Sequence, residues 1–140
     1  MTAQAVLVRL ADATDVRVEV ASGDGWTGAG RGVVEARRDG GGVVVAEAGT
    51  WAAGGGRPMA WTAESRWRAE GAALAVEHRR QGAPASAVLD WTGGRWQARA
   101  PHLCAPDAYD VALWADADEV AVAWTVTGPR KDDRIVTRYR

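Results

Sequence analysis

A period of two in the apolar residues restricts the fold of this chain more than any other feature of its sequence. Val16, Val18 and Val20 alternate with charged residues, so an extended strand would carry the valines on one face and the charges on the other. The same alternation returns at residues 59–68, 74–79 and 120–127. Alanine content supports a helix weakly, at residues 3–10 and 48–53, and no stretch keeps an amphipathic helical spacing over three turns. The pattern predicts an all-β chain with at most one short helix.

Glycine-rich turns separate these runs at intervals of roughly ten residues, which is typical of consecutive antiparallel hairpins. Amphipathic antiparallel strands satisfy their edges either by packing two sheets or by closing into a barrel. Gly28, Gly30 and Gly32 favour the barrel, because a strand with one bare face can bend sharply or let another segment cross it. We therefore expect one domain over residues 1–140, a small antiparallel up-and-down β-barrel of about eight strands with room for one small ligand.

Charge and cysteine content narrow the choice of partners and compartment. The chain has 17 Lys and Arg against 18 Asp and Glu, a net charge of −1, which is not the basic surface that nucleic-acid phosphates require. Cys104 is the only cysteine, so no intramolecular disulfide can form and a reducing compartment is expected. The first apolar run is too short and too charged for a signal peptide or a membrane span. We expect a cytoplasmic protein that binds neither nucleic acid nor membrane, and the oligomeric state stays open.

Tryptophan is the main bulky residue here, because the sequence has eight Trp, two Tyr and no Phe. The core could use most of these rings, or some could line a binding surface. His78 and Arg80 fall on the same face of their strand as Leu74 and Val76, which is the face predicted to point inward. Polar groups buried in this way need hydrogen-bond or charge partners. The alternative to a ligand site is a structural hydrogen-bond network that plugs one barrel end. The predicted ligand-binding set is His78, Arg80, Trp61, Trp67, Tyr109, Trp124 and Tyr139.

Two sets of residues give the chain a resemblance to known families. Residues 25–30, Gly-Trp-Thr-Gly-Ala-Gly, are similar to the Gly-x-Trp-x-Gly-x-Gly opening of the calycin, or lipocalin-like, barrels. Residues 101–139 resemble a family of uncharacterised bacterial and fungal proteins known as a domain of unknown function and thought to be lipocalin-like. The resemblance implies a β-barrel and carries no assigned reaction. Its motif residues are His102, Leu103, Cys104, Asp107, Tyr109, Gly128, Pro129, Arg130, Lys131 and Asp132.

A second likeness is to the nitrobindin-type haem barrels. It rests on the Gly-Trp opening, on Gly-Thr-Trp at residues 49–51 and on Gly-Arg-Pro-Met at residues 56–59. That family ligates haem through a histidine near its C-terminus, and no histidine follows His102 in this chain. We therefore expect no cofactor, and haem would need His78 or His102 as its axial ligand.

The end of the chain predicts a hairpin within residues 124–140, around a Gly-Pro-Arg-Lys-Asp turn. Pro129 presets φ for a turn position, and Gly128 permits the bend. Residues 130–133, two basic residues followed by two acidic ones, would form a solvent-facing loop. A generic turn does not require Arg130, Lys131 and Asp132, so we expect this string either to close one barrel end or to bind an anion.

Other residues with reactive side chains are few. His102 and Cys104, at i and i+2, would share one face of an extended segment and supply two metal ligands, too few for a zinc site. The alternative is an ordered loop with a buried thiol and a hydrogen-bonded imidazole. The sequence has no Gly-x-Ser-x-Gly elbow, and its glycine-rich tract lacks the Lys-Ser/Thr ending of a phosphate-binding loop. We therefore assign no catalytic residue and no metal site.

Three functions from different classes fit these observations. The leading hypothesis is a binding module for a small apolar or amphipathic molecule inside the barrel, because the architecture offers a cavity and the residues offer no catalytic set. One alternative is a small barrel enzyme of isomerase or dehydratase type that uses His78 or His102 as acid or base. The other is an interaction or structural domain with a solid core of tryptophan. An internal cavity that reaches solvent would distinguish the first two from the third.

Overall fold

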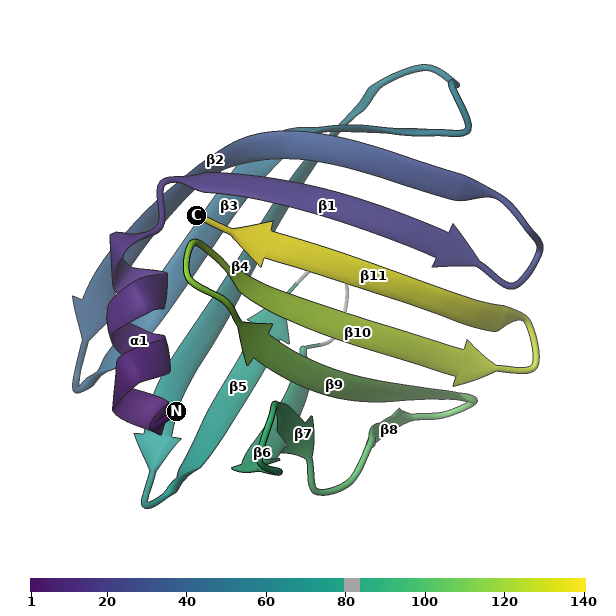
Figure 1. Cartoon of the computed structure of the whole chain (residues 1–140). Coiled ribbons are helices and arrows are strands. Elements are labelled where there is room, and N and C mark those ends of the chain that lie inside the picture. Colours follow the sequence, from purple (N-terminus) through teal and green to yellow (C-terminus); the bar gives the residue numbers. More distant parts are fainter. Residues whose placement is uncertain (80–83) are drawn as a thin grey trace.

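The computed structural model describes residues 1–79 and 84–140, which form a closed antiparallel barrel with a helix at one end (Figure 1). The helix α1 (Ala3–Asp12) comes first. The strands that follow are β1 (Asp15–Ser22), β2 (Thr27–Asp39), β3 (Gly42–Ala53), β4 (Met59–Glu70), β5 (Ala73–Arg79), β6 (Ala85–Trp91), β7 (Trp96–Ala98), β8 (His102–Cys104), β9 (Asp107–Ala115), β10 (Val120–Gly128) and β11 (Lys131–Tyr139). Within the described residues, no helix has the length and apolar character needed to cross a membrane.

The ring of strands follows the order β1–β2–β3–β4–β5–β6–β7–β9–β10–β11, and β11 pairs back onto β1. Every pairing in the ring is antiparallel, and β8 adds to β9 at the rim. Pairing on both sides satisfies the backbone N–H and C=O groups that an open sheet leaves exposed at its edges. The predicted all-β barrel with one short helix is confirmed, with ten strands in the ring rather than about eight.

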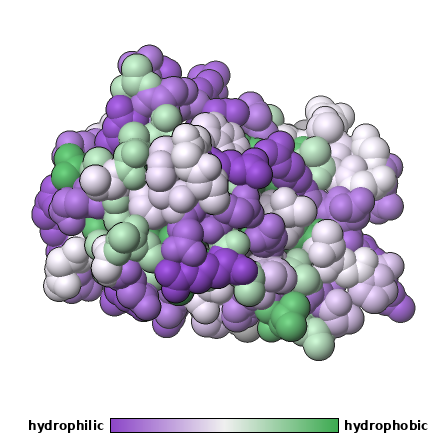
Figure 2. All heavy atoms as spheres, turned by 60° about the horizontal axis from the view of Figure 1, so that its bottom comes forward, coloured by the Kyte–Doolittle hydropathy of each residue, from purple (hydrophilic) through white to green (hydrophobic). Residues whose placement is uncertain are grey.

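The predicted alternation of faces is also confirmed. In β1 the side chains of Val16 and Val18 are buried while Arg17 and Glu19 are exposed. The buried face of β4 carries Trp61, Ala63, Ser65 and Trp67. On the molecular face seen in Figure 2, hydrophilic residues predominate and apolar residues form small separate patches. The strand pattern therefore sorts side chains between the barrel interior and the solvent.

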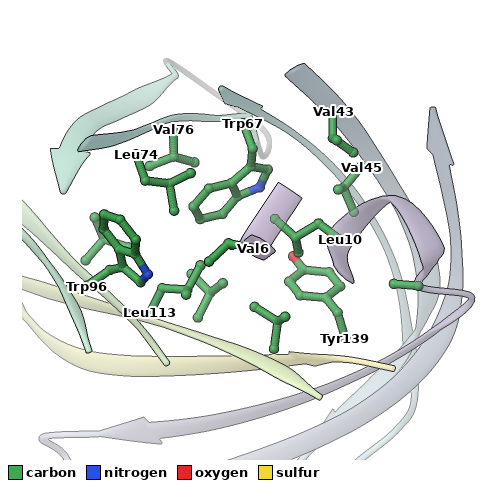
Figure 3. Close-up of a cluster of buried hydrophobic side chains, with 14 of the residues drawn as sticks. Val6, Leu10, Val43, Val45, Trp67, Leu74, Val76, Trp96, Leu113 and Tyr139 are labelled. Atoms are coloured by element: carbon green, nitrogen blue, oxygen red, sulfur yellow. The ribbon is translucent and has the colours of Figure 1, made fainter. Parts of the chain in front are cut away.

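The helix α1 fills one end of the barrel. Thr2 caps it, because its hydroxyl oxygen accepts the backbone N–H of Ala5 at 3.1 Å. Val6, Leu7 and Leu10 lie on one helix face at i, i+1 and i+4, and at most 1% of each is exposed. Figure 3 shows Val6 and Leu10 among the inward side chains of the strands. We call this the helix end, and the opposite rim, with the turns at 23–26, 54–58 and 129–130, the open end.

Residues 48–53, where alanine content gives weak support to a helix, are not helical. These residues belong to β3, which pairs with β2 on one side and with β4 on the other. Two ladders of backbone hydrogen bonds outweigh the weak intrinsic preference of alanine for helix.

A carboxylate organises the turn between β9 and β10 at the helix end. Asp116 accepts the backbone N–H groups of Asp118 at 2.9 Å and Glu119 at 3.0 Å. These hydrogen bonds hold the pKa of the Asp116 carboxyl below its ordinary value. Arg9 of α1 donates to the main-chain carbonyls of Asp116 and Ala117, so the helix is tied to the same turn.

Replacing Leu10 with alanine should lower the free energy of unfolding by about 2 to 5 kcal/mol, because the side chain is fully buried between helix and barrel. Urea denaturation followed by circular dichroism measures the change. Val8→Ala is the matched control: Val8 lies on the same helix and is 41% exposed, so its loss should cost less than about 0.5 kcal/mol. Equal effects of the two substitutions would contradict the assignment of α1 as a plug.

Asp116 should contribute to acid unfolding. Its pKa is lower in the folded state, so its stabilising contribution is present above the unfolded pKa and is lost as the pH falls through the folded pKa. In Asp116→Asn the amide oxygen accepts the same N–H groups at every pH. The variant should therefore lose less stability than the wild type when the pH is lowered from about 5 to about 2. This range brackets the ordinary pKa of a carboxyl group, which is about 4. Denaturant titrations at several pH values test this, and identical pH profiles would count against it.

Candidate ligand site in the open half of the barrel

Inward-facing side chains differ in exposure between the two halves of the barrel. Towards the helix end they are buried, as Trp67, Trp96 and Leu113 show (Figure 3). Towards the open end, side chains of the same inward parity stay partly accessible, and Met59 is 50% exposed. These side chains point into the barrel, so the solvent that reaches them lies in its lumen or at its mouth. The partly accessible inward residues are Val20, Trp51, His78, Tyr109 and Ile135.

Two polar side chains are buried on the inward faces of β3 and β4. Glu47 is 5% exposed, and the indole N–H of Trp61 donates to its Oε1 at 3.4 Å. Ser65 is 3% exposed, and its hydroxyl oxygen accepts the indole N–H of Trp67 at 2.8 Å. These hydrogen bonds fix the two rings while their faces remain available for packing.

The sequence analysis missed Glu47. A signal for it existed, because Glu47 continues the inward parity of Val43 and Val45 in β3. The alanine-rich sequence at residues 46–53 gives weak support to a helix, so the alternation is not followed through Glu47 in the prediction. A strand assignment carried through residue 53 would have placed this carboxylate inside the barrel.

His78 and Trp124 form a contact across the lumen. Their ring centroids lie 5.5 Å apart with planes tilted by 39°. His78 belongs to β5 and Trp124 to β10, two strands that do not pair with each other in the ring. The contact therefore crosses the barrel interior, and we call this pair of rings the floor of the open half.

The structure does not bring the whole predicted ligand-binding set together. Trp61, Trp67 and Trp124 all belong to the buried hydrophobic cluster, with 9%, 2% and 6% of each exposed, and the ring of His78 lies against that of Trp124. The two tyrosines lie near opposite ends, because Tyr109 is opposite Val126 on β10 and Tyr139 is opposite Val120. Tyr139 is 4% exposed beside Leu10 (Figure 3), so its predicted place with Tyr109 is wrong. Arg80 lies outside the described residues.

The family-type motif gathers at the rim, where β8 and β9 meet the β10–β11 turn. Lys131 forms an ion pair with Asp107 at 3.2 Å, and this hydrogen-bonded carboxylate raises the pKa of the lysine. A Cβ at Gly128 would meet the carboxylate of Asp107, so a larger residue there would require the Asp107 side chain to move. The turn consists of Pro129 and Arg130, since Gly128 already pairs with Lys131 in the ladder.

One expectation about this rim is corrected. Lys131, Asp132 and Asp133 belong to β11 rather than to a loop, because the ladder with β10 continues through them. The main-chain carbonyl of Asp132 accepts the N–H of Gly23 at 2.6 Å, and its Cβ stands against that glycine. Lys131 and Asp132 thus contact neighbouring strands and turns at this rim, and Arg130 is exposed. The expectation that this string closes the barrel end or binds an anion stays a prediction.

The segment at residues 101–106 differs in part from the expected ordered loop. It contains the short strand β8, and the thiol of Cys104 is exposed rather than buried. Leu103 is 75% exposed, because a strand paired only at the rim has no second layer over it. The imidazole is hydrogen-bonded as expected: Nδ1 of His102 accepts the N–H of Ser86 at 3.4 Å, and its ring stands edge-on to Tyr109 at 6.4 Å.

His102 of β8 is thus hydrogen-bonded to β6. The short strand β7 pairs with both β6 and β9, and this contact of His102 lies beyond the end of those pairings. Among residues 1–79 and 84–140, no three His, Cys, Asp or Glu side chains are grouped to hold a metal ion. The expectations about haem, catalysis and metal binding at His78, His102 and Cys104 stay predictions.

Glycines on the wall of the open half make room for two indoles. A Cβ at Gly49 would lie 2.5 Å from Cη2 and Cζ3 of Trp61. At Gly28 it would lie 3.0 Å from Cζ3 of Trp51, and at Gly30 it would lie 2.5 Å from the Cβ of Trp51. The bare face of β2 is covered in part by the side chain of Trp51, from the neighbouring strand β3.

The fold and its lumen define a closed, helix-plugged antiparallel β-barrel. The chain belongs to the family described as "Family of unknown function (DUF6314)", whose model matches residues 13–140. This confirms the resemblance to a domain of unknown function. No curated protein matches the chain.

Solved structures similar to the chain include designed barrels. A de novo designed fluorescence-activating β-barrel has 12% identity and a TM-score of 0.49, with 96% of this chain and 97% of that chain covered. The redesigned barrel mFAP1, bound to DFHBI, has 12% identity and a TM-score of 0.47, with coverages of 100% and 99%. The redesigned barrel mFAP0, also bound to DFHBI, has 14% identity and a TM-score of 0.47, with coverages of 94% and 98%.

Replacing Gly49 with alanine should lower the free energy of unfolding by more than about 2 kcal/mol, because the new methyl group meets the carbonyl of Arg31 and the ring of Trp61. Gly94→Ala is the matched control: nothing lies within 4 Å of its added Cβ, and stability should change by less than about 1 kcal/mol. Thermal and urea unfolding of both variants measure the difference. Similar stabilities of the two variants would show that the backbone of β2 and the ring of Trp61 can move to accommodate the methyl group.

Proposed function

We propose that the chain is a binding module that holds a small apolar or amphipathic molecule in the open half of the barrel. The observation that carries this proposal is the exposure of inward-facing side chains. Trp51, Tyr109 and Ile135 point into the barrel and still meet solvent. A concave, mainly apolar site with a few polar groups is the usual form of a small-molecule site.

The residues of the open half divide into two kinds. Aromatic and aliphatic side chains supply contact area, with Trp51, Trp61 and Ile135 as examples. Glu47 and His78 are the polar groups on the wall and floor, and groups of this kind fix the orientation of a ligand. The ligand is therefore amphipathic, with an apolar body and at least one polar group.

We make two further proposals, on the group of barrels to which the protein belongs and on its cellular location. We group the barrel with the calycin-like binding proteins, on the strength of its closed antiparallel ring and its Gly-Trp opening at residues 25–26. We also propose a cytoplasmic location, because an exposed free thiol such as that of Cys104 suits a reducing compartment.

Native mass spectrometry of freshly purified protein should detect a retained small molecule, or the protein should bind the amphipathic dye 1-anilinonaphthalene-8-sulfonate with about one molecule per barrel. Ile135→Glu places a charge in the lumen and should weaken dye binding about tenfold or more, since a charge in an apolar site carries a large desolvation cost. Val33→Glu is the control, because Val33 is 61% exposed on the outer parity of β2. Circular dichroism checks that both variants fold.

Absence of both a retained molecule and dye binding would overturn the binding function. Equal dye affinity in Ile135→Glu and Val33→Glu would show that the dye binds outside the lumen, and this too would overturn it.

A further inference from the structure

Three tryptophans lie at increasing depth between the mouth of the barrel and Glu47, and we call Trp26, Trp51 and Trp61 the indole ladder. Trp26, in the turn between β1 and β2, is 39% exposed, and Trp61 is 9% exposed. Trp51 lies between them in exposure. The rings of Trp26 and Trp51 have centroids 6.3 Å apart and planes tilted by 34°, an offset arrangement nearer to parallel than to perpendicular.

The glycines of β2 and β3 hold the lower two rings of the indole ladder against the wall. The ring carbons nearest to Gly28 belong to Trp51, and those nearest to Gly49 belong to Trp61. Glycine has no side chain to stand between backbone and ring, so each indole occupies the space beside the wall. The ring surface turned away from the wall then faces the lumen.

A hydrogen bond sets the orientation of the deepest ring. Trp61 donates its indole N–H to Oε1 of Glu47, so the polar edge of the ring is directed along the wall. Glu47 is held in turn by a strand paired on both sides. A ring fixed at its edge and backed by Gly49 loses little conformational freedom on binding, which favours affinity.

The opposite side of the open half also carries flat groups. Trp124 and His78 form the floor, and Tyr109 projects inward from β9. Aromatic side chains therefore supply much of the lining of the open half, and Ile135 and Val20 supply aliphatic contact. Offset stacking of aromatic rings is favourable beyond the area that they bury. A site of this shape selects for a flat ligand.

We propose that the ligand is a planar aromatic molecule that stacks on the faces of the indole ladder inside the open half of the barrel. This inference rests on the proposed binding function and specifies its ligand class. The aromatic body lies against Trp51 and Trp61, and Trp26 covers it at the mouth. The polar group of the ligand is directed towards the floor, where Glu47 and His78 lie.

A pair of probes with the same carbon skeleton and hydroxyl position, one flat and aromatic and the other saturated, tests the inference. Calorimetric or dye-displacement titration should show that 2-naphthol binds about tenfold more tightly than decahydro-2-naphthol, a difference of about 1.4 kcal/mol. Trp51→Leu should reduce this preference to about twofold or less, because it removes a stacking face and keeps an apolar side chain. Trp51→Phe keeps a ring and should retain most of the preference. Trp91→Leu is the control, since Trp91 lies at the helix-end terminus of β6 and is 41% exposed.

The outcomes separate the two proposals. Equal affinities of the two probes for the wild-type protein would overturn the planar aromatic ligand and leave a less selective binding function. A preference unchanged in Trp51→Leu would overturn the role of the indole ladder. Binding of neither probe, together with no retained molecule and no dye binding, would overturn the binding function itself.

Discussion

A ring of ten strands encloses more space than its own inward side chains fill, and the rest of the structure depends on how that space is divided. About eight strands give a barrel whose side chains just fill it. Here α1 enters at one end and packs Leu7 and Leu10 against the strands, which completes a dense core in that half. The helix does not extend into the other half. The contact between His78 and Trp124 marks the boundary between the packed half and the accessible one.

The open half depends on glycine as much as on tryptophan. In most barrels a bare strand face allows the sheet to bend, and here Gly28 and Gly49 also receive the rings of Trp51 and Trp61. Side chains at these positions would push the indoles into the lumen and fill it. The same residues thus determine the shape of the barrel and the amount of aromatic surface that a ligand can meet.

Local patterns in the sequence predicted what depends on single strands. The alternation at Val16 and Val18 gave the buried face of β1, and the parity of His78 placed it in the interior. Features set by distant pairing could not be predicted in this way. The end of the barrel at which Tyr139 lies follows from strand register across the whole ring, and the role of α1 as a plug follows from packing against several strands. Glu47 was missed because alanine-rich sequence concealed a strand.

Closure of the ring by β1 and β11 has a consequence for the order of folding. The backbone N–H groups of Thr14 and Asp15 donate to the carbonyl of Arg140, so the two ends of the ring meet beside the plug. On the ribosome, β1 emerges early and has no second neighbour until β11 follows, more than a hundred residues later in the sequence. Pairing of such high contact order is slow. Until β11 docks, α1 lies at the mouth of an incomplete sheet with its apolar face accessible to other nascent chains and to chaperones.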